Sequence, residues 1–167
     1  MHPKQPKLIQ AFEITHEPKG KCYKALLDFA SERCSQFSLV WRDQLDFEIT
    51  ATEIKQPLRH FMVSQKRTSI WPGTKIIKSK ATVIHYRITK ETMRILQQVD
   101  SLYSWLSPKL PEDLALYADE GRCWLATVTH EAGAWIVDAM LDPQDLQKSV
   151  PLLQFKAVKT EPYLLVF

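Results

Sequence analysis

Glycine is scarce in this chain, with four residues among 167, at positions 20, 73, 121 and 133. A glycine-rich loop that wraps a phosphate or a dinucleotide needs several glycines close together, and this spacing provides none. The GxSxG turn that carries the nucleophile of α/β-hydrolases is absent as well. The sequence therefore excludes the common phosphate-loop and serine-hydrolase motifs.

Long apolar runs and paired cysteines are also missing. The longest uncharged stretches, such as CWLATVTH (123–130), fall far short of the ~20 apolar residues of a membrane span. No apolar segment follows the basic start MHPKQPK, so no signal peptide is expected. Cys22, Cys34 and Cys123 are odd in number and form no CxxC motif, which indicates buried free thiols in a reducing compartment. These absences predict a cytoplasmic protein that does not enter the membrane.

Positive charge is concentrated in the middle of the chain. Residues 54–94 hold ten Lys and Arg against one acid, Glu91, which gives +9, although the whole chain carries only +3. Such a segment fits an acidic protein partner, and it equally fits an ordinary solvated face or a surface covered in part by the acidic C-terminal half. The interleaved Trp71, His85 and Tyr86 also fit a nucleic-acid groove, in which bases stack on aromatic rings. The candidate binding residues of this segment are Trp71, Lys75, Lys78, Lys80 and Arg87.

The pattern of apolar residues predicts an α+β domain with a mixed or largely antiparallel sheet and three to four helices. Residues 1–7 are expected to be a disordered tail and 8–167 a single domain. Strands are predicted at 7–15, 36–43, 78–88, 114–118, 123–130, 134–140 and 161–167, and helices at 20–34, 56–65, 90–106 and after the Asp142 cap. Turns are predicted at Pro72-Gly73 and at 119–121.

Two pairs of polar neighbours are candidates for chemistry. His130-Glu131 would begin an HExxH zinc motif, but position 134 is alanine, so the second histidine is missing. Cys123 and His130 lie ~23 Å apart along an extended strand, which excludes a dyad within it. Glu112 and Asp113 are expected to point to opposite sides of the chain and to cap backbone groups or to be solvated. No catalytic residue, metal ligand or cofactor is predicted from these pairs.

Four short motifs follow one another between residues 70 and 138. They are WPGT (71–74), SLYSW (101–105), LPEDL (110–114), and Trp124-Leu125 followed by His130-Glu131. Their order resembles a group of small bacterial proteins with EWPGT, SLYDW, LPEDL and W…HE motifs, often labelled stage III sporulation protein AH. Ser104 stands where that group has an acidic residue. The resemblance implies a bacterial protein with a shared fold, and it implies no activity.

Together these observations predict a non-enzymatic cytoplasmic binding protein of the immunity type, which neutralises an acidic protein partner through its charged surface. Glu112, Asp113, His130 and Glu131 join the basic segment as candidate binding residues. Two alternatives remain open at this point. One is a nucleic-acid-binding protein that uses residues 54–94, and the other is an enzyme in which His130 and Glu131 act as acid and base.

Overall fold

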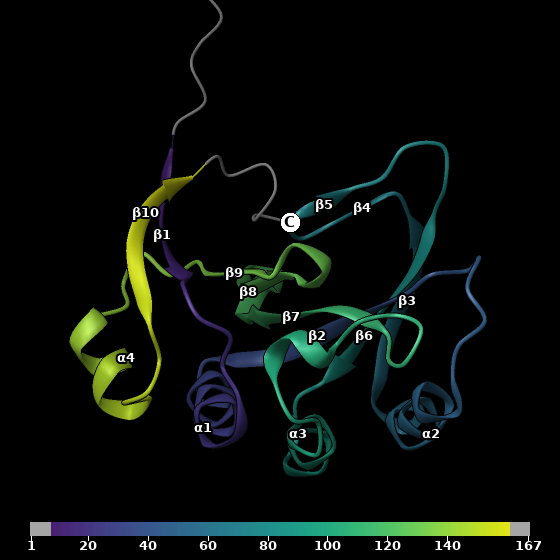
Figure 1. Cartoon of the computed structure of the whole chain (residues 1–167), viewed down its shortest axis with the longest axis horizontal. Helices are drawn as coiled ribbons and strands as arrows, with labels where there is room; N and C mark the ends of the chain where they lie inside the picture. The colour runs from purple at the N-terminus through teal and green to yellow at the C-terminus, as the bar shows by residue number, and fades with distance from the viewer. Residues whose placement is uncertain (1–7, 161–167) are drawn as a thin grey trace, which may run out of the picture.

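Eight antiparallel strands form one sheet with the order β10-β1-β9-β8-β7-β2-β6-β3 (Figure 1). The computed structural model describes residues 8–160, so the predicted tail (1–7) and the predicted strand at 161–167 lie outside the described residues. The strands of the sheet are β1 (Ile9–Ile14), β2 (Cys34–Trp41), β3 (Met62–Thr68), β6 (Ala81–Arg87), β7 (Glu112–Ala118), β8 (Cys123–Val128), β9 (Gly133–Ile136) and β10 (Phe155–Thr160). This architecture confirms the predicted α+β class and the largely antiparallel sheet.

Four α-helices accompany the sheet: α1 (Gly20–Ser31), α2 (Ile49–Leu58), α3 (Lys90–Gln97) and α4 (Pro143–Ser149). Figure 1 shows α1, α2 and α3 along one face of the sheet, where the main hydrophobic core lies between the two layers. Two helix starts follow directly from the sequence. The Thr89 hydroxyl accepts a hydrogen bond from the Thr92 N–H, and the Asp142 carboxylate caps α4 ahead of Pro143. No helix within residues 8–160 is long and apolar enough to cross a bilayer.

A short hairpin covers part of the opposite face. Its strands are β4 (Ile70–Trp71) and β5 (Thr74–Lys75), joined by the predicted Pro72-Gly73 turn. Gly73 has a φ of +81°, and a Cβ there would lie 2.6 Å from Cγ2 of Val128, so both the turn and its close approach to β8 require glycine. Trp71 is thereby buried in a small apolar cluster on this face with Val40, Ala81 and Val83. The WPGT motif thus holds the hairpin against the sheet.

Strand β8 is buried on both faces, as its sequence predicts, but its side chains do not alternate regularly. Cys123 pairs with Tyr117 and Leu125 pairs with Leu116, so one extra residue is inserted at Trp124. Because of this bulge, Trp124 and Leu125 both reach the main core, whereas Cys123 and Ala126 face the other side. Regular alternation along β8 would place Trp124 and Ala126 on one face, and the bulge separates them.

Three predicted helices differ from the structure in their bounds. The prediction at 56–65 is wrong at both ends, because α2 begins at Ile49 and ends at Leu58. A 3-10 turn (Arg59–Phe61) follows, and β3 begins at Met62, where the chain pairs with β6. The prediction at 90–106 is too long, since α3 ends at Gln97 and only a 3-10 turn (Leu102–Ser104) follows. The helix stops because the chain bonds elsewhere. The Asp100 carbonyl accepts the Gly20 N–H, and the Leu102 N–H donates to Pro18.

The three cysteines are free and buried, as predicted, although Cys34 lies in another element than expected. The helix predicted over 20–34 ends at Ser31, and Cys34 opens β2 instead of sharing α1 with Cys22. Burial raises the pKa of the Cys34 thiol to about 12 and also raises the pKa values of Cys22 and Cys123. At neutral pH these thiols are protonated side chains of the core, and they are not activated nucleophiles.

Candidate functional site

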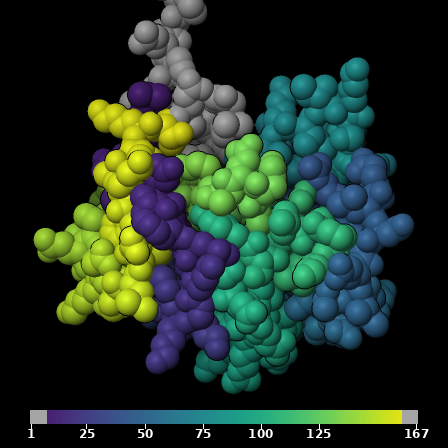
Figure 2. Space-filling model, viewed as in Figure 1, coloured from purple at the N-terminus to yellow at the C-terminus, as the bar shows by residue number. Residues whose placement is uncertain are grey.

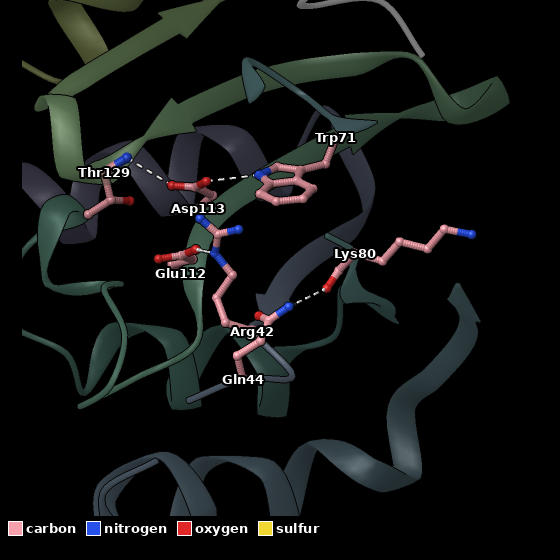
Figure 3. A network of polar contacts seen from close by, with 7 residues as sticks. All are labelled: Arg42, Gln44, Trp71, Lys80, Glu112, Asp113 and Thr129. Atoms are coloured by element: carbon pink, nitrogen blue, oxygen red, sulfur yellow. Dashed lines mark hydrogen bonds and ion pairs between the residues drawn. The ribbon is translucent and has the colours of Figure 1, made fainter. Parts of the chain in front are cut away.

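Three consecutive residues after β2 connect two polar regions of the molecule. Arg42 bonds the buried Glu112, and Gln44 contacts the backbone of Lys80 (Figure 3). Between them, Asp43 holds Arg67 at the surface. The segment 42–44 therefore lies between a buried acidic pair, Glu112 and Asp113, and a group of exposed basic side chains. The two regions are described in turn.

Asp113 is the centre of the buried region. Its Oδ2 accepts a hydrogen bond from Trp71 Nε1 at 2.8 Å, and its Oδ1 accepts one from the Thr129 N–H at 2.8 Å. Its own N–H donates to the Trp105 carbonyl at 3.3 Å. Only 2% of Asp113 is exposed, so these partners take the place of water. The WPGT, SLYSW and LPEDL motifs and the start of the His130 turn all meet at this residue.

A β-bulge explains how Asp113 reaches these partners. The β2–β7 pairing shifts between Ser38–Ala115 and Val40–Glu112, which leaves an additional residue on β7. Asp113 has a φ of +56°, a conformation that aspartate tolerates better than most residues. The bulge aims its side chain at the hairpin and at the Thr129 turn. Of the two predicted alternatives, capping a backbone group or being solvated, the structure shows the first for Asp113.

Glu112, the neighbouring acid, is bonded to Arg42 by an ion pair between Oε1 and Nε. Its side chain is 7% exposed and that of Arg42 is 24% exposed, so Glu112 is also not solvated. Burial raises the pKa of Glu112, the nearby charge of Asp113 raises it further, and Arg42 partly offsets both effects. The Arg42 guanidinium also lies 5.3 Å from the Trp71 ring centroid, a cation–π distance. Arg42 thus contacts both parts of the buried region: it bonds Glu112 directly, and it lies near the Trp71 ring, whose N–H donates to Asp113.

The exposed region is a shallow hollow of about 520 Å³ beside the ends of β3 and β6. We call it the basic hollow, and its lining residues are Gln44, Arg67, Ser69, Ile76, Lys78, Ser79 and Lys80. Three of these side chains are basic and none is acidic. Outside the lining, Asp43 accepts hydrogen bonds from Arg67 Nε at 3.0 Å and from the Thr82 hydroxyl at 2.8 Å. Gln44 donates weakly to the Lys80 carbonyl at 3.5 Å.

The structure brings together only some of the basic candidates. Lys78 and Lys80 lie in the basic hollow, and Figure 3 shows the Lys80 side chain directed away from the buried acids. Lys75 is exposed on the hairpin, which projects at the upper right of Figure 2 in teal. Arg87 is at the far end of β6, about 20 Å along the strand from Ala81. Lys78 and Lys80 therefore share the basic hollow with Arg67, whereas Arg87 lies on another part of the surface.

The aromatic residues of the basic segment are not placed for base stacking. Trp71 is 2% exposed and Tyr86 is 1% exposed, and both pack into apolar clusters. His85 is half-buried and packs against Tyr117, with 4.7 Å between ring centroids. Stacking on exposed rings is a main source of affinity for single-stranded nucleic acid. The basic segment thus offers charge without the accompanying aromatic platform.

His130 and Glu131 lie in an exposed 3-10 turn, Thr129–Glu131, directly after β8. Their side chains are 49% and 68% exposed, and His130 Nε2 lies 3.8 Å from Glu131 Oε1. Neither side chain lines the basic hollow or the largest cleft of the described surface. Within residues 8–160 no three His, Cys, Asp or Glu side chains gather as metal ligands would. The pair therefore lies at the surface, where both side chains meet solvent.

The largest cleft, of about 900 Å³, lies between α2 and the segment that follows α3. Its walls include Tyr103 and Ser104 of the SLYSW motif and the stretch 106–110. Within residues 8–160, the Tyr103 and Ser107 hydroxyls are buried without a hydrogen-bond partner. Its lining includes three acidic residues, Glu48, Glu53 and Asp100, and one basic residue, Lys109, so this cleft differs in charge from the basic hollow.

Sequence reasoning missed Arg42, Asp43 and the role of Arg67. Arg42 and Asp43 follow directly after a buried strand, which is a signal for residues at a sheet end, but their partners are distant in sequence. Arg67 was counted among the basic residues, yet its stretch had no clear strand pattern.

Comparisons with protein-family models, curated proteins and solved structures give no match to this chain.

Proposed function

We propose that the chain is a non-enzymatic, cytoplasmic bacterial binding protein that holds an acidic protein partner at the basic hollow, in the manner of an immunity protein. The observation that carries this proposal is the lining of the hollow. Arg67, Lys78 and Lys80 meet there with no acidic residue in the wall. Complementary charge of this kind speeds association and selects the partner.

The surrounding structure supports the same interpretation. The ten basic residues of 54–94 are all exposed, and Arg67 alone among them is in an ion pair within residues 8–160. Nine of these ten charges are therefore not neutralised by an ion pair within the described residues, and they are available to a partner. Within residues 95–160, no acidic side chain forms an ion pair with them. The buried Arg42 and Asp113 contacts hold the loop 42–44 and the hairpin that border the hollow.

A binding assay with defined probes tests this proposal. The probes are a labelled poly-L-glutamate chain and a labelled 20-nucleotide DNA, followed by fluorescence anisotropy at low and at physiological salt. The variant Lys78→Glu/Lys80→Glu is compared with Lys21→Glu/Lys90→Glu, which changes the charge equally in the first turns of α1 and α3. We expect the first variant to lose polyglutamate binding and the second to keep it.

Equal binding by both variants would refute the basic hollow as the site. The DNA probe separates the alternative function. Tight DNA binding that falls steeply with salt, while polyglutamate does not bind, would favour the nucleic-acid alternative. The buried positions of Trp71 and Tyr86 lead us to expect only weak, charge-driven DNA binding.

A further inference from the structure

The sheet ends at β3, and this edge is open. β3 pairs with β6 on one side, and within residues 8–160 no strand pairs with its other side. Six of its seven residues are exposed, including Met62 and Val63, which are 46% and 47% exposed. An edge strand of this length presents a row of unpaired N–H and C=O groups, which is a template for another strand.

The charges of β3 select what can pair with it. Lys66 lies opposite Val83, on the face of the sheet that carries the hairpin, and it lines a small hollow there with His85 and Tyr117. Arg67 lies opposite Thr82, and its side chain is on the other face, where it bonds Asp43. Successive strand residues point to opposite faces, so β3 presents one basic side chain on each side of its edge.

We propose that β3 receives an extended acidic segment of a partner protein as a ninth strand of the sheet. Main-chain hydrogen bonds along β3 provide the pairing, and adjacent acidic residues of the segment meet Lys66 on one face and Arg67 on the other. The basic hollow continues this surface, because Arg67 belongs to both. The inference rests on the proposed function and adds how the acidic partner is held.

A second copy of this chain fits the edge less well. Pairing two β3 strands would place two Lys66 and two Arg67 side chains on one seven-residue edge, and lysine on an edge is a known device against such self-association. An acidic strand would instead place negative side chains beside Lys66 and Arg67, so the charges attract. Charge complementarity therefore favours a hetero-partner with an acidic, extended segment.

Two peptides of equal charge test the inference. The first is a seven-residue peptide of valine and threonine with two central glutamates and blocked ends. The second has the same sequence with N-methyl groups on its backbone amides, which keeps the charges and removes the donors for strand pairing. Binding to the full chain is followed by amide NMR shifts and by hydrogen exchange of the β3 amides, with wild type, Lys66→Glu and the control Lys90→Glu.

We expect the unmethylated peptide to slow exchange of β3 amides, and the methylated peptide to bind roughly ten-fold more weakly, since several main-chain hydrogen bonds are lost. Lys66→Glu weakens binding of the first peptide, and Lys90→Glu does not. If both peptides bind equally and the shifts stay in the basic hollow, the edge inference is wrong and the proposed function stands. If neither this peptide nor polyglutamate binds, the proposed function fails and the inference fails with it.

Discussion

Arg42 and Arg67 both bind a carboxylate near the same end of the sheet, and their surroundings are opposite. The Arg42–Glu112 pair is 24% and 7% exposed, whereas the Arg67–Asp43 pair is 66% and 30% exposed. A buried pair cannot lose one member without leaving an unpaired charge, while an exposed pair exchanges its partner for water at little cost. The first pair therefore fixes the structure, and the second leaves its arginine free to bind another carboxylate.

The same contrast separates the motifs from the basic segment. The motifs WPGT, SLYSW and LPEDL look like a functional signature in the sequence, but they converge on Asp113 in the interior. The basic residues Lys78 and Lys80 carry no motif and lie at the surface. Four predictions test this division between structural and binding residues, from the largest expected effect on stability to the smallest.

Replacing Asp113 is expected to cost the most. Asp113→Ala leaves the indole N–H of Trp71 and the N–H of Thr129 buried without an acceptor, and it places alanine at a positive φ. We expect a loss of about 2–5 kcal/mol in the free energy of unfolding, measured by urea denaturation. Asp113→Asn keeps one acceptor and tolerates this φ, so its loss should be smaller. A loss below about 1 kcal/mol for the alanine variant would show that these contacts are not important to the fold.

Glu112→Gln should change how stability depends on pH. A carboxyl whose pKa is raised by folding holds its proton more firmly in the folded state. Its contribution is fully present below the ordinary pKa of 4.5 and is lost as the pH rises through the raised value. Wild type should therefore lose stability relative to Glu112→Gln as the pH rises above 4.5 in urea melts. The opposite trend would mean that Arg42 outweighs burial and lowers the pKa of Glu112.

Reversing the basic hollow should leave the fold intact. Lys78→Glu/Lys80→Glu changes two exposed side chains outside the ion pairs, so the free energy of unfolding should stay within about 0.5 kcal/mol of wild type. The same preparation is used for the binding assay with polyglutamate, so that lost binding is not mistaken for unfolding. A large loss of stability would place these lysines with Asp113 among the structural residues.

His130→Ala is expected to have the smallest effect. The imidazole is half exposed in the turn after β8, and its contact with Glu131 at 3.8 Å is solvated. Stability should change by less than about 0.5 kcal/mol, and binding of polyglutamate should be unchanged. A variant that folds normally but loses function would identify the His130-Glu131 pair as a site and revive the enzyme alternative.

The elements with strong patterns were predictable, and the exposed and bulged ones were not. β2 and β6 alternate apolar residues clearly, and Thr89 and Asp142 mark helix starts, so the sequence locates them. β3 shows no alternation because both of its faces meet solvent, and only its pairing with β6 makes it a strand. Whether an exposed edge segment such as β3 forms a strand depends on its pairing with a neighbouring strand, which the local sequence does not reveal.

The site was predictable only in its charges. Composition points to Lys78 and Lys80, but the inclusion of Arg67 and the separation of Arg87 follow from the register of β3 and β6. For Glu112 and Asp113 the assumption of regular alternation failed, because a β-bulge and a positive φ at Asp113 change the direction of the side chain. Such a bulge leaves no mark in the sequence that distinguishes an interior carboxylate from a capping one.

The position of β1 has a consequence for how the protein is made. β1 is the first described strand, and it lies between β9 and β10, the last two, with Ile9 opposite Thr160. During synthesis β1 leaves the ribosome long before either neighbour exists, so its apolar residues Phe12 and Ile14 have no strand to pair with until translation of this region is nearly complete. The strands β2, β6, β7 and β8 can pair earlier, since they are closer together along the chain. Closure of the sheet by β1 and β10 is therefore a late step in folding, and a chaperone that shields an early apolar segment would act on β1.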